Sequence, residues 1–537
     1  MTSFPEASGS PAVPQSTPPA SSDTVAAPSM LNTFDRFVGH LFAPPIVIAP
    51  AQAWLVLGLA GTLAVWTDVL FYGAGMGVNV MLWFAAIAGA TVFAAARLGR
   101  RVATDRLVVI AMAVVLSGVP ALRDSGALQF FSLVAALALM GIGVALPPDV
   151  GVRCMSPVAF VIALASCAVS LLTAEARLVA LLPRHAWRAE GRANHTRLVV
   201  RSLLIAVPML VVFATLFASA DAVFADQLGR IFTFDASTVM EHGFWLLFGL
   251  WVATASLWSV VAVDLPGDVV ASVPERHRLG RVEVGVVLGS LATLFALFVL
   301  VQVRYLFGGA DVVQSSIGLT YAEYARCGFF ELVAVALLLL PVLAGINWAR
   351  QQTKAASRLF LGLAALLIVL VLVLVIIGSA WKRMAMYREA FGLTELRFYV
   401  VTAMPLIGAA LVWFFVSVWT RRVEQFLGGT MALAALTLFI VIAVNPDAMI
   451  ARTNAARIED GREFDAHYAG MLSADAVPVL LARREALAAA LTSDQRCDLS
   501  LAFRDNAESG DGVRSWNWSR WQAERQIAQH PQALRCD

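Results

Sequence analysis

Long apolar runs recur along most of the chain and limit the folds that it can adopt. Each run is near the ~20 residues that an α-helix needs to cross a ~30 Å hydrocarbon core, and we count roughly twelve of them. No run alternates apolar and polar residues as a barrel strand does, so helices are the form in which the backbone can satisfy its own hydrogen bonds in lipid. The sequence therefore predicts an all-α fold, a polytopic transmembrane helix bundle, over the windows 50–71, 78–97, 106–122, 127–146, 154–174, 199–219, 243–263, 282–306, 321–346, 358–380, 398–419 and 427–445.

The composition agrees with a membrane protein. Hydrophobic residues make up 59% of the 537 residues and charged residues only 14%, whereas a typical soluble domain is about 25% charged. The formal net charge is +2, and the arginines lie between apolar runs, so we predict the lipid bilayer as a partner and no nucleic acid. The motifs GxxxxGKS/T, HExxH and GxSxG do not occur, so no nucleotide-driven pump or hydrolase is indicated and we predict no cofactor.

We divide the chain into four regions. Residues 1–30 are rich in Pro, Ser and Ala, which is typical of a disordered tail. No basic segment precedes the first apolar run, so we expect that run to be an uncleaved anchor. Residues 31–200 are predicted to form an N-terminal transmembrane region, 201–445 a transmembrane core, and 446–537 a small helical domain outside the membrane.

Lys and Arg in the short loops indicate the orientation, because cytoplasmic loops carry an excess of these residues. The loop at 97–106 does not fit the parity of the others, so the span count is off by one between residues 106 and 182. We assign the basic side to a bacterial cytoplasm, which places the protein in the cytoplasmic (inner) membrane and the C-terminal domain outside. The basic loops that share this side are 177–201, 276–281, 350–358 and 421–422.

Two of the five cysteines, Cys497 and Cys536, lie in the polar tail. An extracytoplasmic tail permits a disulfide between them, whereas in the cytoplasm both would stay reduced. No CxxC or Cys/His spacing is typical of zinc. Because the acidic cluster of Glu463, Asp465 and His467 also lacks a complete ligand spacing, we predict no metal.

The polar residues around the window 321–346 form the first candidate site. A hydrophobic run ends in Arg304, and the next one carries Glu323, Tyr324, Arg326 and Glu331 into its apolar body. On a helix Tyr324 and Glu331 are seven residues apart and lie on nearly the same face, so a narrow polar stripe is predicted to run inward from the outer surface.

Glu331 is the deepest ionisable group in this stripe. If Thr320 caps the helix, Glu331 lies eleven residues in, or roughly 16 Å at about 1.5 Å per residue. A carboxylate at this depth is costly and normally has a partner or a proton. It is therefore either a structural partner of Arg304, Arg326 or Lys382, or a group that couples protons or binds a ligand.

The tripeptide Gly-Leu-Thr occurs twice, at 318–320 and 392–394, each time directly before an apolar run. A turn at Gly followed by Thr at the N-cap suits a helix that re-enters the membrane, because the first N–H groups of a helix lack partners. We expect Asp68, by contrast, to be a helix-end residue that faces the headgroups. The candidate residues at the outer face are Asp221, Tyr387, Thr394, Glu395 and Arg397.

The polar tail predicts short helices. Asn445 is expected to cap a helix with Pro446 at its first position, and Asp475 to cap another that has Pro478 in its first turn. Three tryptophans near the end are expected to be core residues or interfacial anchors. They are Trp516, Trp518 and Trp521.

Several segments carry a resemblance to a known family. They are SADAVF at 219–224, QVRYLFGG at 302–309, GLTYAEYARCGFFEL at 318–332, the stretch 387–397 with GLTELR, NPDAMIARTN at 445–454, LSADAVPVL at 472–480 and RSWNWSR at 514–520. Together they resemble the bacterial domain-of-unknown-function family 4173, formerly grouped with family 4153, from about Arg201 to about Arg520. The resemblance implies a polytopic bacterial membrane protein and supplies no activity.

Three classes of function stay open. The first is a permease or lipid-handling carrier for an unknown small molecule or lipid, which we favour because the deepest ionisable group lies within the membrane. The second is a membrane enzyme that modifies an envelope or lipid-linked substrate at the outer face, with Asp221, Glu323 and Glu395 as candidate acids. The third is a non-catalytic scaffold or sensor whose outer domain meets an envelope protein.

Overall fold

The computed structural model describes residues 50–99, 102–145, 167–173, 236–262, 281–307, 329–349, 356–508 and 512–530, with isolated residues and pairs elsewhere between 160 and 224. Every regular element within these ranges is helical. The all-α prediction is therefore confirmed for this part of the chain.

Eight of the described helices are long and apolar enough to cross a membrane, so the chain is a multi-pass membrane protein. The expected count of roughly twelve spans, each of ~20 residues, is not confirmed. Two further predicted windows hold the helices α10 and α15, while 154–174 and 199–219 fall mostly outside the described residues. The eight spans are Ala51–Phe71, Val78–Arg97, Thr104–Leu122, Gly126–Val144, Val282–Val301, Leu366–Phe391, Glu395–Trp419 and Val423–Val444.

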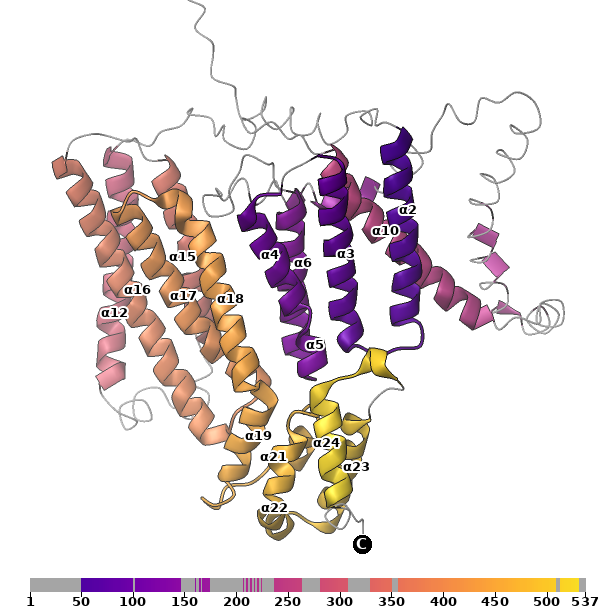
Figure 1. Cartoon of the computed structure of the whole chain (residues 1–537). Helices are drawn as coiled ribbons and strands as arrows, with labels where there is room; N and C mark the ends of the chain where they lie inside the picture. Colours follow the sequence, from indigo (N-terminus) through magenta and orange to yellow (C-terminus); the bar gives the residue numbers. More distant parts are fainter. Residues whose placement is uncertain are drawn as a thin grey trace, which may run out of the picture.

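The first half of the chain forms one group of helices around its own core (Figure 1). Buried residues of this core include Val56, Trp83, Ala113 and Leu257. Side chains on the outside of the group are apolar and exposed, as Phe130 is, which is the surface that lipid tails cover. The helices are α2 (Pro50–Phe71), α3 (Val78–Arg97), α4 (Thr104–Leu116), α5 (Val119–Leu122), α6 (Gly126–Ala145) and α10 (Ala236–Ala262).

The second half forms another group with a separate core (Figure 1). Leu339, Val373, Leu411 and Phe414 are buried in it. Contact with the first core comes from the partly buried residues of α18 that face it, Met431, Leu438 and Ile442. The helices are α12 (Arg281–Phe307), α15 (Phe329–Ala349), α16 (Ala356–Phe391), α17 (Glu395–Trp419) and α18 (Phe426–Val444).

Short helices after α18 form a C-terminal domain that lies at one end of both groups (Figure 1). Its core contains Ile450 and Leu480 together with Val119 and Leu128 of the first group and Phe398 of the second. The domain therefore connects the two groups at this end. Its helices are α19 (Pro446–Ala456), α20 (Ala466–Gly470), α21 (Val477–Ala482), α22 (Arg484–Ala490), α23 (Ser493–Ala507) and α24 (Trp518–Gln529).

The segment before α24 docks on the turn between α2 and α3. Val78 N donates to Trp516 O at 3.1 Å, and Arg514 Nη1 donates to Val69 O at 2.6 Å. A Cβ at Gly77 would lie 2.5 Å from the backbone carbon of Ser515, so the two backbones approach more closely than any other residue at this position would allow. Trp516 and Trp518 beside this contact are both about 40% exposed, at 40% and 43%, so neither is a core residue.

We predict that Gly77→Ala detaches this segment. The added methyl group meets backbone atoms that cannot rotate away, and overpacking of this kind costs about 1 to 3 kcal/mol. The measurements are the apparent Tm in detergent and the rate of trypsin cleavage after Arg514 and Arg520. Gly75→Ala is the matched control, because its Cβ would meet nothing closer than 3.8 Å. Equal behaviour of the two variants would show that the close contact is absent.

Candidate functional site

The residues of the predicted polar stripe are only partly described. Glu323, Tyr324 and Arg326 lie outside the described residues. Arg304 lies on α12 and Glu331 on α15, but the surroundings of both side chains lie outside what the structure describes. Whether these residues form one site therefore stays a prediction.

Asp221, which is predicted to lie at the outer face, is described and makes a local contact. Its Oδ1 accepts a hydrogen bond from Phe224 N at 3.1 Å, and the residue is exposed. Among the described residues, the remaining outer-face candidates all lie at the turn between α16 and α17, next to the C-terminal domain.

Tyr387 and Arg397 lie together at this turn. The guanidinium carbon of Arg397 is 4.3 Å from the centre of the Tyr387 ring, which is a favourable cation–π geometry. Arg397 Nη1 also donates to Phe391 O at 3.1 Å and to Gly392 O at 2.7 Å. Arg397 thus satisfies the carbonyls at the end of α16, and the Tyr387 ring packs against its guanidinium group.

The prediction for Thr394 was wrong in its mechanism. Thr394 stands at the N-cap of α17, but its side chain makes no capping hydrogen bond. The hydroxyl of Tyr468 on α20 accepts the hydrogen bond from Glu395 N at 2.8 Å instead. A residue of the C-terminal domain therefore accepts the hydrogen bond of the first N–H group of a membrane helix. No local sequence pattern could reveal this contact.

Asn454 of α19 and Arg457, which follows this helix, fix the same turn. Asn454 Oδ1 accepts from Leu393 N and Asn454 Nδ2 donates to Leu393 O, both at 2.8 Å. Gly392 has φ +77° and lies against Asn454, so the turn needs the conformational freedom of glycine. Arg457 donates to the carbonyls of the last turn of α16, namely those of Arg388, Glu389 and Ala390.

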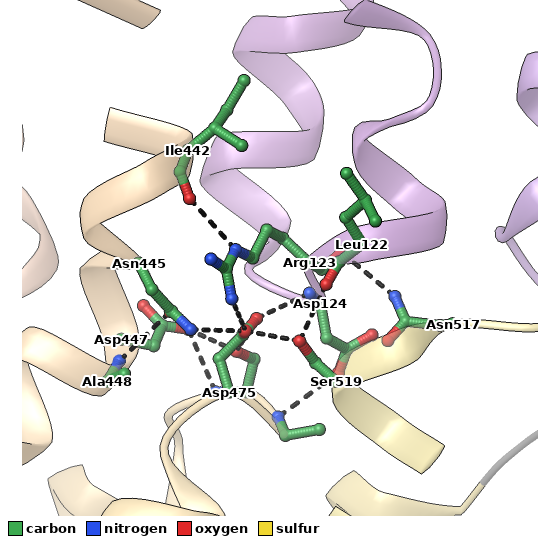
Figure 2. A network of polar contacts seen from close by, with 12 residues as sticks. Leu122, Arg123, Asp124, Ile442, Asn445, Asp447, Ala448, Asp475, Asn517 and Ser519 are labelled. Atoms are coloured by element: carbon green, nitrogen blue, oxygen red, sulfur yellow. Dashed lines mark hydrogen bonds and ion pairs between the residues drawn. The ribbon is translucent and has the colours of Figure 1, made fainter. Parts of the chain in front are cut away.

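Asp475 lies at the centre of a buried polar junction between the two helix groups and the C-terminal domain (Figure 2). Its side chain is 1% exposed. Oδ1 accepts from Ser519 Oγ at 2.5 Å and from Asn445 Nδ2 at 2.8 Å, and Oδ2 accepts from Asp124 N at 2.7 Å. The expected capping of a helix by Asp475 was wrong, because Ala476 is the N-cap residue of α21. The cap by Asn445 is confirmed, since its side chain accepts from Ala448 N at 3.4 Å.

Arg123, which follows α5, connects the junction to the second helix group. Its Nε donates to Ile442 O near the end of α18 at 3.0 Å, and its Nη1 lies 3.4 Å from Asp475 Oδ1. Asn517 Nδ2 donates to Pro120 O and to Arg123 O, at 2.7 and 3.1 Å. One guanidinium group therefore bridges both helix groups and the C-terminal domain.

Asp447, on the first turn of α19, is 1% exposed. Its Oδ2 accepts from Ser473 N at 3.2 Å and from Ser473 Oγ at 2.5 Å, while Oδ1 is buried and has no hydrogen-bond partner among the described residues. Burial, with the charges of Glu395 and Asp475 adding to it, raises the pKa of Asp447 to about 7. This carboxyl group can therefore exchange a proton near neutral pH.

Asp124 is the second carboxyl group with a displaced pKa. Burial raises its pKa to about 6, although Arg520 and a hydrogen bond from Ala474 N oppose the shift. Arg520 Nε lies 3.2 Å from Asp124 Oδ1. The junction thus combines Asp475, which is surrounded by donors, with two carboxyl groups that titrate close to physiological pH.

The described residues hold no group of three or more His, Cys, Asp or Glu side chains placed to bind a metal ion. Asp465 of the acidic cluster in the tail caps α20, where its side chain accepts from Tyr468 N at 2.8 Å. The two carboxyl groups with raised pKa can exchange protons, and the oxygen atoms of the junction can bind small polar groups or ions.

A second polar contact lies between α2 and α10. His242 Nδ1 is 2.7 Å from Asp68 Oδ1, and the His242 ring stacks on Tyr72 with the ring centres 3.7 Å apart. Asp68 lies in the last turn of α2, as expected for a helix-end residue, and its carboxylate pairs with a histidine 174 residues away. Whether it also faces headgroups stays a prediction.

Sequence reasoning missed Arg123, Asp124 and Asp447 as site residues. The junction does, however, unite three of the segments that carry the family resemblance, those at 445–454, 472–480 and 514–520. The polar residues in these segments could have been recognised from the sequence. The sequence did not show that the three segments contact one another in the folded protein.

Cys497 takes part in a disulfide. Cys536, its predicted partner, lies outside the described residues. The pairing of these two cysteines stays a prediction.

We predict that Asp475→Ala strongly destabilises the protein. The substitution leaves Arg123, Asp124 N and Asn445 without their buried acceptor, and breaking one side of a buried ion pair costs about 3 to 5 kcal/mol. Thermal unfolding in detergent measures the effect.

Glu459→Ala is the matched control. Glu459 forms an ion pair with Arg483 in which it is 68% exposed, and exposed pairs contribute about 0 to 1 kcal/mol. A loss for Asp475→Ala no larger than for Glu459→Ala would contradict the junction.

Comparison with known proteins gives a family but no activity. No curated protein and no solved structure matches the chain significantly. The model of one family, described as Domain of unknown function (DUF4153), matches residues 110–482. The match therefore starts well before Arg201, where the resemblance was expected to begin, and ends before the segment RSWNWSR. Since it covers more than half of the chain, this multi-pass membrane protein belongs to the DUF4153 family.

Proposed function

We propose that the protein is a carrier, a permease for a small molecule or lipid, whose two helix groups move against each other. The observation that carries this proposal is the division of the membrane helices into two separately packed groups that a polar junction fastens at one end. Carriers alternate access by rocking one rigid bundle against another. The two cores provide the rigid bodies, and the contacts between the groups, which are those of α18 with the first core and those of the junction, are the part that must change.

The polar contacts of the junction are of a kind that can break and form again. They are hydrogen bonds and one ion pair through Arg123, whose side chain is 23% exposed, and they hold α5, α18 and the C-terminal domain together. Polar contacts of this kind exchange for water at small net cost. They lie beside the apolar core of the C-terminal domain, which also contains residues of both helix groups and would have to adjust when the junction opens.

Orientation and cellular location belong to the same proposal. The basic loops favour a bacterial cytoplasmic membrane with the C-terminal domain outside, and the disulfide at Cys497 supports an oxidising compartment for this domain. In this arrangement the junction closes the outer end of the carrier. The proposed units are the regions 1–30, 31–200, 201–445 and 446–537.

An enzyme is the second candidate, since Glu395, Asp447 and Asp475 converge at the end of the membrane helices rather than at the midplane. Converging carboxyl groups at this depth suit acid and base chemistry on a lipid-linked substrate. We rank this second because Asp475 is fully engaged with structural donors.

We predict two distances between the helix groups at the end opposite the C-terminal domain. Ala103 before α4 and Thr420 after α17 are exposed at that end. Spin labels at Ala103→Cys and Thr420→Cys, with Cys154, Cys167 and Cys327 replaced by Ser, would report the separation in nanodiscs by pulsed electron paramagnetic resonance. A carrier gives a bimodal distribution, and Arg123→Gln shifts its populations because it weakens the junction.

The control pair is Ala51→Cys with Ala103→Cys, since both positions belong to the first helix group and should give one distance in every sample. A single distance for the Ala103 and Thr420 pair, unchanged by Arg123→Gln, would contradict the carrier and favour a rigid scaffold.

A further inference from the structure

The surroundings of Asp447 contain more acidic groups than the protein itself compensates. The charges that act most strongly on Asp447 are those of Glu395 and Asp475, both acidic. The cationic groups of the junction engage other partners, because Arg123 contacts Asp475 and Arg520 contacts Asp124. A buried carboxylate normally has a cationic partner, and Asp447 has none among the described residues.

Two polar atoms at this place are buried without a hydrogen bond. One is Asp447 Oδ1 and the other is Tyr399 Oη. Tyr399 stands one helical turn after Glu395 on α17, so both side chains lie on the same face. Its hydroxyl lies near the Ser125 side chain and experiences the charges of Asp447 and Glu395. Unpaired buried polar atoms are rare in native proteins and call for an explanation, of which a bound ion is one.

Hydroxyl groups of two serines also lie close to Asp447 and Glu395. Ser125 is 1% exposed, and its hydroxyl lies 3.5 Å from Glu395 Oε1. Ser473 occupies the other oxygen of Asp447, so Oδ1 is the atom left for a ligand. Oxygen donors of this type prefer hard cations. Among the described residues no third carboxylate, histidine or cysteine joins the two carboxyl groups to form a metal cluster, and Asp447 stays neutral up to about pH 7, so a single positive charge suits the site better than a divalent metal.

We propose that Asp447, Glu395, Tyr399 and Ser125 form a binding site for one small monovalent cation, a sodium ion or a proton, between α17, α19 and the turn after α5. In a carrier this cation is the coupling ion, and this role rests on the proposed function. Cation binding does not depend on the proposed function, so we expect it even if the two helix groups do not move against each other. The titratable and charged groups that face Asp447 or its immediate neighbours are Glu395, Tyr399, Tyr468, Asp475, Asp124 and Arg123.

The two cations differ in their pH dependence. Asp447 holds its proton up to about pH 7 in the folded protein but only to about 3.8 when unfolded. The stability that the neutral group contributes is therefore lost as the pH rises through about 7. Sodium can replace the proton only above this pH, where Asp447 is ionised.

The test is the apparent Tm of the full-length protein in detergent at pH 6.5 and pH 8.5, with NaCl exchanged for KCl or choline chloride at constant ionic strength. For a sodium site we expect the Tm at pH 8.5 to rise saturably with sodium, by about 2 to 4 °C, and to change little at pH 6.5. For a site that takes only the proton we expect a lower Tm at pH 8.5 than at pH 6.5 and no preference for sodium.

Asp447→Asn should abolish both responses, because the amide is neutral at every pH. Tyr399→Phe should weaken the rise of the Tm with sodium and leave the dependence of the Tm on pH unchanged. This second variant tests the proposal if Asp447→Asn does not fold. Asp498→Asn is the control, since it removes an exposed carboxylate of the same domain. The proposal is overturned if wild type responds to neither cation, or if Asp447→Asn responds as wild type does.

Discussion

The carboxylate of Asp475 is the contact on which the arrangement of the chain depends. Donors from α5, from the end of α18 and from the start of α24 converge on its two oxygens. These segments belong to the first helix group, the second helix group and the C-terminal domain. Because donors from all three parts converge on this one buried acceptor, the three parts are held together while it stays intact.

The C-terminal domain thereby acts as part of the membrane structure. Tyr468 satisfies the first N–H group of α17, and Arg457 satisfies the last carbonyls of α16. Ends of membrane helices are the places where backbone groups lack partners, and here a neighbouring domain supplies them. The close approach at Gly77 continues the same contact to α2 and α3. A domain that caps several membrane helices couples their movements, which is why the carrier proposal assigns the opening to this end.

The junction contains one carboxylate that is held by several donors and a second carboxyl group that can change its charge near neutral pH. Asp475 is surrounded by donors, whereas Asp447, at hydrogen-bond distance from Ser473, has an oxygen without a partner and a pKa of about 7. Ser473 Oγ lies 2.5 Å from Asp447 Oδ2 and 3.4 Å from Asp475 Oδ2. The Ser473 hydroxyl therefore lies between the carboxyl group with the raised pKa and the carboxylate that holds the helix groups.

The sequence by itself determined what is local. Apolar runs of sufficient length specify membrane helices because lipid leaves the backbone no other partner, and Asn445 followed by Pro446 specifies the start of α19. It did not determine the capping of α17 by Tyr468, the pairing of Asp68 with His242 or the role of Asp475. Each of these joins residues far apart in the chain, up to 352 positions for Arg123 and Asp475. Only the tertiary structure brings such residues together. A buried polar side chain needs a hydrogen-bond partner, but the residues next to it in the sequence do not indicate which distant residue that partner is.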